Sequence, residues 1–110
     1  MVDISSVVAV LDRIHGELSA EYPYHAGLAV SLAEEVQRDF GAAGARYCSA
    51  EWWGGAGSMF DIAPSDRVMR RRLAVLLVEL VEQFDRVGIR CASAASGAEI
   101  LKKWLAAGAI

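Results

Sequence analysis

Proline and cysteine are both scarce in this sequence. Pro23 and Pro64 are its only prolines, and long stretches run without proline or glycine, so collagen-like and linker-like chains are excluded. Two cysteines, Cys48 and Cys91, are too few for the disulfide framework of a small secreted domain. We therefore expect both cysteines to be buried, reduced thiols.

The sequence also lacks an excess of positive charge and a long hydrophobic run. Eleven Lys and Arg residues stand against 14 Asp and Glu residues, a net charge of −3, whereas nucleic-acid binders normally carry a basic excess. The longest apolar run, Leu73 to Val78, is far shorter than the roughly 20 residues that a membrane helix needs. The first residues lack the basic start and apolar run of a secretory signal. These absences predict a cytoplasmic protein without nucleic-acid or membrane partners.

What is present is the composition of a folded globular domain. Hydrophobic residues make up 55% and charged residues 23% of the sequence. A chain of 110 residues is long enough for one core and too short for two. Apolar residues recur at helical spacing in four segments. The predicted helices run from Ile4 to Leu18, from Pro23 to Phe40 with Gly41 as terminator, from Pro64 and Ser65 to Val87 before Gly88, and from a capping box of Ser96 and Glu99 to a stop at Gly108. In the third helix, we expect the inward face to begin at Val68.

Residues 42–63, between the second and third predicted helices, are ambiguous. They contain the segment Trp53-Gly54-Gly55-Ala56-Gly57-Ser58, whose glycines permit either a hairpin or a tight connection. We favour a short helix over residues 42–51 followed by a turn. The predicted fold is a mostly α, single-domain bundle of about four helices over residues 1–110, with a Gly-rich connection.

No motif assembles a catalytic or metal centre. The glycine cluster lacks the Gly-Lys-Ser/Thr ending of a P-loop, so a close-packed turn is favoured over a phosphate cradle. His15 and His25 have no third ligand at metal spacing. The two cysteines are solitary, and no local motif supplies a base for Ser58. We expect no catalytic residue, no cofactor and no metal, and hence a protein that is not an enzyme.

Charge is spread unevenly along the chain. Residues 1–62 hold nine acidic and three basic residues, a net charge of −6, and residues 63–110 hold five acidic and eight basic residues, a net charge of +3. Four arginines, at positions 67, 70, 71 and 72, crowd the start of the third predicted helix, where the helix dipole disfavours cations. We expect acidic residues such as Asp61 and Asp66 to offset this cost by pairing within the chain.

The segment from Trp53 to Ile62 resembles the Gly-Gly-Met-Gly-Ser-Phe-Asn-Asp-Leu segment of a family of small bacterial proteins known only as a domain of unknown function. The positions that match directly are Gly54, Gly55, Gly57, Ser58 and Asp61. Phe60 departs from the pattern, because that family tends to have Asn there. The helical layout of residues 7–87 is also similar. Proteins of this kind are often encoded beside toxins as their antidotes, so the resemblance implies a toxin-immunity role.

We therefore expect a non-enzymatic interaction protein, most concretely an immunity protein that binds and occludes a bacterial toxin domain. An acidic surface from the second helix and the glycine segment would cover a basic active-site cleft, and electrostatic attraction would accelerate the encounter. The predicted contacts are carboxylates and exposed aromatic anchors: Glu34, Glu35, Asp39, Glu51, Trp52, Trp53 and Asp61.

Two alternatives stay open. A small anion- or nucleotide-binding protein or enzyme would use the Gly-rich segment and the arginine cluster. A homodimer would use the apolar surplus around Leu73 to Val78.

Overall fold

Six helical segments make up the part of the chain that the computed structural model describes, residues 3–110. They are α1 (Ser5–Leu18), α2 (Pro23–Arg38), α3 (Phe40–Tyr47), α4 (Ala50–Trp53), α5 (Arg67–Arg86) and α6 (Ala92–Ala107). Those residues form no strand, so the mostly α prediction is confirmed, as is the preference for a short helix and turn over a hairpin in residues 42–63. The count of about four helices is wrong, because α3 and the single-turn α4 add to the four long ones.

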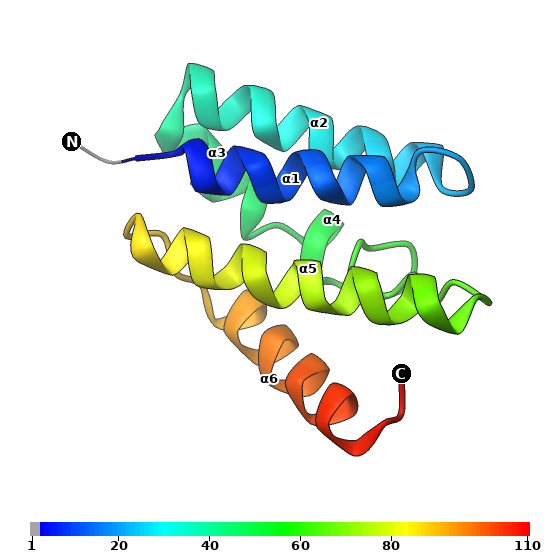
Figure 1. Ribbon diagram of the computed structural model, residues 1–110. Helices are drawn as coiled ribbons and strands as arrows, with labels where there is room; N and C mark the ends of the chain where they lie inside the picture. Colours follow the sequence, from blue (N-terminus) through cyan, green and yellow to red (C-terminus); the bar gives the residue numbers. More distant parts are fainter. Residues whose placement is uncertain (1–2) are drawn as a thin grey trace.

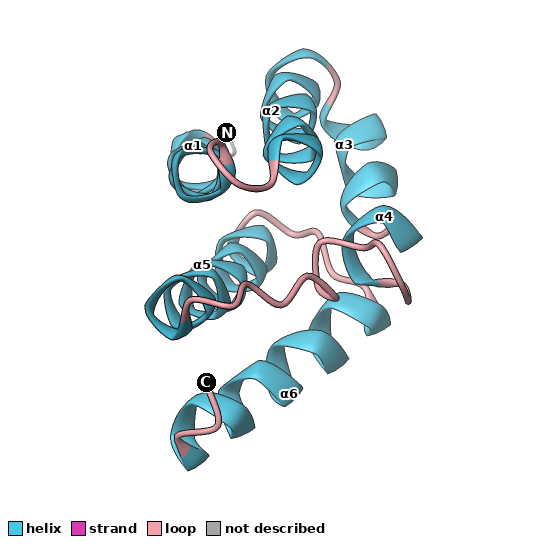
Figure 2. Ribbon diagram, turned by 90° about the vertical axis from the view of Figure 1, so that its right-hand side faces the viewer, coloured by secondary structure: helices cyan, strands magenta, loops and turns pink. Residues whose placement is uncertain are grey.

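The helices form a closed ring of contacts around the core. The antiparallel helices α1 and α2 pack side by side, and α5 lies between this pair and α6 (Figures 1 and 2). On the far side the ring is completed through α3 and α4, since α2 contacts α3, α3 contacts α4, and α4 contacts α6. The two short helices therefore connect the first helical pair to the last helix.

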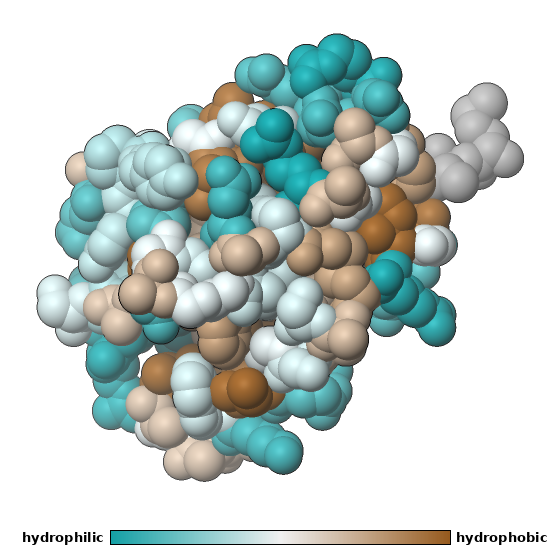
Figure 3. Space-filling view, turned by 180° about the vertical axis from the view of Figure 1, so that it is seen from behind, coloured by the Kyte–Doolittle hydropathy of each residue, from teal (hydrophilic) through white to brown (hydrophobic). Residues whose placement is uncertain are grey.

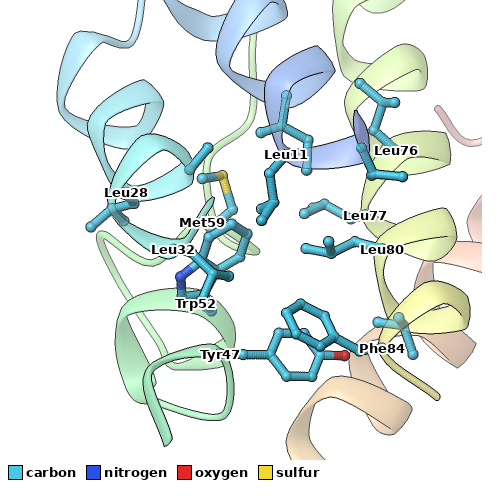
Figure 4. Packing of buried hydrophobic residues seen from close by; sticks show 14 of the residues in the cluster. Leu11, Leu28, Leu32, Tyr47, Trp52, Met59, Leu76, Leu77, Leu80 and Phe84 are labelled. Atoms are coloured by element: carbon cyan, nitrogen blue, oxygen red, sulfur yellow. The ribbon is translucent and has the colours of Figure 1, made fainter. Parts of the chain in front are cut away.

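The core is one cluster to which all six helices contribute, and α5 supplies its largest share. Leu73, Leu76, Leu77 and Leu80 follow the i, i+3, i+4, i+7 spacing that places apolar side chains on one helix face. Figure 4 shows leucines of α1 and α2 facing this row. Full burial of each such side chain contributes roughly 1.5–3 kcal/mol, so this leucine row is a substantial part of the core.

At its far end the core is closed by an aromatic pair. The ring of Tyr47, at the end of α3, stacks on Phe84 of α5 with centroids 3.9 Å apart and planes at 21° (Figure 4). Both residues are almost fully buried, at 1% and 0% exposed. This contact attaches the α3–α4 segment to the central helix.

The second predicted helix is divided at Asp39. The backbone there is extended, with φ −151° and ψ 96°, and α2 ends at Arg38. The Asp39 carboxylate accepts a hydrogen bond of 3.1 Å from the Ala42 amide, so it caps the new helix α3. The predicted terminator Gly41 instead lies inside α3, and Phe40 begins that helix. Asp39 is thus the N-cap of α3 and not a residue within one continuous helix.

The ends of the last two helices also differ in part from the prediction. Asp66, not Pro64 or Ser65, caps α5 by accepting a 2.8 Å hydrogen bond from the Val68 amide. The predicted capping box at Ser96 is wrong, because α6 begins at Ala92 and Ser96 lies within it. The predicted stop at Gly108 is confirmed, since this residue caps α6 in the left-handed conformation at φ 70°.

None of the helices within residues 3–110 combines the length and the apolar character required to span a membrane.

Candidate functional site

The glycine segment is a closed turn that folds back over α4. The Met59 and Phe60 amides donate hydrogen bonds of 2.8 Å to the carbonyl oxygens of Glu51 and Trp52. The hydroxyl of Ser58, a buried residue, donates to the Gly54 carbonyl at 2.8 Å and accepts from the Asp61 amide at 3.1 Å. Because the amides of residues 58–61 are all used within the chain, they do not form a cradle for a phosphate.

One side chain of α2 fastens this turn to the helical pair. The Nε2 atom of His25 lies 2.9 Å from the Gly57 carbonyl oxygen. Gly57 itself has φ +88°, a conformation that other residues rarely adopt. The turn is therefore held at its tip by His25 and after its tip by hydrogen bonds to α4, so it presents a defined surface.

The two adjacent tryptophans of α4 point into the protein, so the expectation that they are exposed anchors is wrong. Trp52 is 0% exposed and Trp53 is 8% exposed. Trp52 lies among the core side chains in Figure 4. The Trp53 indole donates a 3.0 Å hydrogen bond to the Tyr47 carbonyl and packs against Gly97 of α6. Both rings are buried because α4 is enclosed between the core, the glycine turn and α6.

Two of the predicted contact carboxylates have roles inside the fold. Glu35 is half-buried and forms an ion pair with Arg38, one turn further along α2. Asp39 is exposed but caps α3 through the Ala42 amide. These two residues therefore stabilise the junction of α2 and α3, whatever else they contact.

The other three predicted carboxylates are exposed and weakly engaged. Glu34 and Asp61 form no ion pair or side-chain hydrogen bond within residues 3–110. Glu51 lies 3.8 Å from Arg46, a contact that is open to solvent on both sides. Such exposed pairs are worth roughly 0–1 kcal/mol, so all three carboxylates are free to meet a partner.

The segments that carry these residues follow one another along the chain. The helices α3 and α4 and the loop after them lie together on the side turned away from α1, and the end of α2 leads into them (Figure 2). We call the exposed surface of residues 34–61 the acidic face, because this segment holds five acidic residues and two arginines, a net charge of −3. Figure 3, which looks at the molecule from behind, shows hydrophilic side chains gathered at the top, where α2 runs.

Three of the four clustered arginines at the start of α5 bind other parts of the chain. Arg67 donates to the Gly108 carbonyl at 2.7 Å and Arg71 to the Ile110 main-chain oxygen at 2.8 Å. Arg72 lies 3.6 Å from Glu17 of α1. Of the expected pairing with acidic residues, only the contact of Arg72 with Glu17 is found within residues 3–110. Asp66 caps the helix instead, and Asp61 forms no ion pair there.

A groove of about 770 Å³ runs between α1 and α5. Val68 and Val75 line it and are 57% and 47% exposed, so the prediction that Val68 belongs to the inward face is wrong. Ion pairs from Arg13 to Glu79, at 2.6 Å, and from Arg72 to Glu17 join the two helices along it. Leu73 and Leu77, in the apolar run that the homodimer alternative would use, are buried in the core.

The two cysteines are neighbours in space, so the expectation that they are solitary is wrong. Cys48 follows α3 and Cys91 precedes α6, and both are free and half-buried. Burial, together with a hydrogen bond to Cys91, raises the pKa of the Cys48 thiol to about 12. The thiol of Cys48 therefore stays protonated at neutral pH, which disfavours nucleophilic chemistry there.

Within residues 3–110, no group of three or more His, Cys, Asp or Glu side chains is arranged to hold a metal ion. No protein-family model, no curated protein and no solved structure matches the chain. The resemblance of the glycine segment to a bacterial family stays a prediction.

Proposed function

We propose that this protein is a non-enzymatic interaction protein of the immunity type, which binds a basic toxin domain through its acidic face and occludes that domain's active site. One observation carries the proposal. The net charge of residues 34–61 is −3, which equals the net charge of the whole chain, so the rest of the sequence is neutral on balance. A surface with one sign of charge attracts a partner of the opposite sign over roughly a Debye length of 8–10 Å.

The exposed carboxylates divide into two groups under this proposal. Glu34, Glu51 and Asp61 have no strong internal partner and are the residues that meet the basic partner. Glu35 and Asp39 hold the α2–α3 junction and contribute mainly through their charge. The two tryptophans support the surface from beneath and do not contact the partner.

The geometry of the glycine turn also supports binding by a rigid surface. Its amides bond to α4, and its tip is held by His25. A surface that is ordered before binding loses little conformational freedom when the complex forms. Occlusion by such a surface requires no chemical step from the protein itself.

A pull-down from lysate of the source organism, at low and at moderate salt, tests this proposal when the captured proteins are identified by mass spectrometry. The wild-type protein should retain one stoichiometric, basic partner. The triple variant Glu34→Lys, Glu51→Lys, Asp61→Lys should lose it, since three charges are reversed and the net charge of the acidic face changes by six units. The purified partner should lose its toxic activity when mixed with the wild-type protein.

The matched control is the triple variant Asp12→Lys, Glu21→Lys, Glu82→Lys, which makes the same change in net charge at exposed positions outside the acidic face. It should keep the partner. Equal loss in both variants would show that total charge, and not this face, governs binding. Recovery of the bait alone at both salt concentrations, with the partner expressed, would contradict the proposal itself.

A further inference from the structure

A cavity of about 240 Å³ lies between α5, α6 and residues 60–64, beside the acidic face. Leucine side chains of α5 and α6, at positions 73, 77 and 101, line its apolar wall. Phe60 and Trp104 line it as well, and their rings stack with centroids 6.3 Å apart and planes at 20°. Trp104 is 44% exposed, which is unusual for so large an apolar residue in a small protein.

Among the described residues that line this cavity, Arg70 is the one cation. It lies in the first turn of α5, among arginines whose side chains bind Gly108, Ile110 and Glu17. The side chain of Arg70 forms no hydrogen bond or ion pair within residues 3–110, and its Nε atom is buried without a partner. A buried donor without a partner is costly. The Nε atom of Arg46 and the Nε1 atom of Trp52 are buried without a partner as well, but of these three donors only Arg70 lines this cavity.

A carboxylate of the chain is near but does not neutralise Arg70. Asp61 lines the same cavity and forms no ion pair with Arg70 in the part of the chain that the structure describes. Asp61 is exposed, so water screens its charge, whereas the Nε donor of Arg70 is shielded from water. The cavity therefore combines apolar walls with an available guanidinium group.

We propose that this cavity binds a small carboxylate with an apolar body. The guanidinium group of Arg70 would bind the carboxylate, since its planar array of donors matches the two carboxylate oxygens. The apolar body would lie against Phe60, Trp104 and the leucines. The cavity is smaller than the roughly 300–1,000 Å³ that holds a drug-sized ligand, so the ligand is of the size of a branched-chain or single-ring acid. The cavity shares Phe60 and Asp61 with the acidic face, but this proposal does not rest on the proposed binding of a toxin domain.

Titration with 4-methylpentanoate, followed by the NMR signal of the Trp104 indole N–H, tests this proposal. The indole signals are assigned with the variant Trp104→Phe. We expect a saturable shift for 4-methylpentanoate and for phenylacetate. Their neutral amides should bind at least tenfold more weakly, because they lack the charge that Arg70 recognises. Acetate, which has the charge without the apolar body, should produce no saturable shift over the same range.

The variant Arg70→Met keeps the apolar stem and removes the guanidinium group, and it should weaken 4-methylpentanoate binding by at least tenfold. Its folding should be preserved, since Arg70 has no internal partner to lose. The matched control is Arg90→Met, which removes an exposed arginine paired with Asp85 and absent from the cavity wall. The control should bind as the wild type does.

Equal binding of acid and amide by the wild-type protein would overturn the assignment of a carboxylate, and this arm needs no variant. Unchanged binding in Arg70→Met would overturn the role of Arg70. The site would be overturned if neither acid produced a saturable shift up to roughly 10 mM. A dissociation constant above that concentration would be too weak for a specific site.

Discussion

The ring of Trp53 packs so closely on Gly97 that a Cβ atom there would lie 2.8 Å from the ring carbon Cε3. This contact joins α4 to α6 and completes the ring of helices. The Trp53 ring has little freedom to move away, because its indole nitrogen donates to the Tyr47 carbonyl and Phe60 lies beside the ring, with centroids 6.1 Å apart. The close packing of Trp53 therefore requires glycine at position 97, although alanine has the higher helix propensity.

We predict that Gly97→Ala destabilises the protein. Overpacking costs roughly 1–3 kcal/mol, and the gain in helix propensity returns about 1 kcal/mol, so the net loss is up to about 2 kcal/mol. The matched control is Gly27→Ala in α2, where a Cβ would meet nothing within 4 Å. That variant should gain up to about 1 kcal/mol. Urea unfolding of both variants measures the difference, and equal effects would contradict the close contact.

The cap at Asp39 supports a second prediction. Asp39→Ala removes the acceptor for the Ala42 amide and should lower the free energy of unfolding by about 0.5–2 kcal/mol. Asp39→Asn keeps a side-chain oxygen and should remain within a few tenths of a kcal/mol of the wild type. Equal losses in the two variants would show that the charge, and not the cap, is what matters. Urea unfolding at neutral pH measures both.

Two neighbouring groups make stability fall in alkali. Burial raises the pKa of Cys48 from 9.0 to about 12, and burial also raises the pKa of Tyr47 well above its ordinary value of 10.0. Both groups are neutral in either state at neutral pH. Above that pH the unfolded chain releases protons that the folded protein keeps, so the free energy of unfolding falls as the pH rises from about 9 towards 12.

Unfolding measured between pH 8 and pH 11 tests this dependence. Cys48→Ser removes one titrating group, so its stability should fall less steeply from pH 9 upward. The decrease that remains should begin near pH 10, where an unfolded tyrosine ionises. Identical slopes in Cys48→Ser and the wild type would exclude Cys48 as a source of the effect.

The three tryptophans should differ sharply in their access to solvent. Trp52 and Trp53 are buried, whereas Trp104 is 44% exposed. Acrylamide should therefore quench one accessible fraction of the fluorescence and leave a second fraction largely unaffected. The variant Trp104→Phe should lose the accessible fraction. Strong quenching that persists in that variant would show that the α4 tryptophans are not enclosed as described.

Local patterns in the sequence were sufficient for the long helices. The helical spacing of apolar residues in α1, α2 and α5 is visible in the sequence, and Gly108 ends α6 as predicted. The same patterns failed where one residue serves two elements. Asp39 ends α2 and caps α3, and a local pattern favours neither role over the other. The predicted start of α6 at the Ser96 capping box was wrong, because the helix begins earlier, at Ala92. A capping box is a local motif and can also occur inside a helix.

The candidate site was predictable only in part. The carboxylates of the acidic face could be found from composition, because charged side chains remain at the surface in most folds. The burial of Trp52 and Trp53 could not be found in this way, because aromatic residues beside acidic ones suit a core and an interface equally well. The cavity at Arg70 was also missed, since its walls come from residues 60–64, α5 and α6.

By itself, the sequence determined the fold class, the main helices and the acidic bias of residues 34–61, because helical periodicity and net charge are properties of local segments. Only the tertiary structure decided that the Arg70 side chain lines a cavity without an internal partner, that Cys48 lies near Cys91, and that both tryptophans of α4 face inward. These features depend on contacts between segments far apart in the chain. Such contacts form when the helices close their ring around a shared core, and no local pattern encodes them.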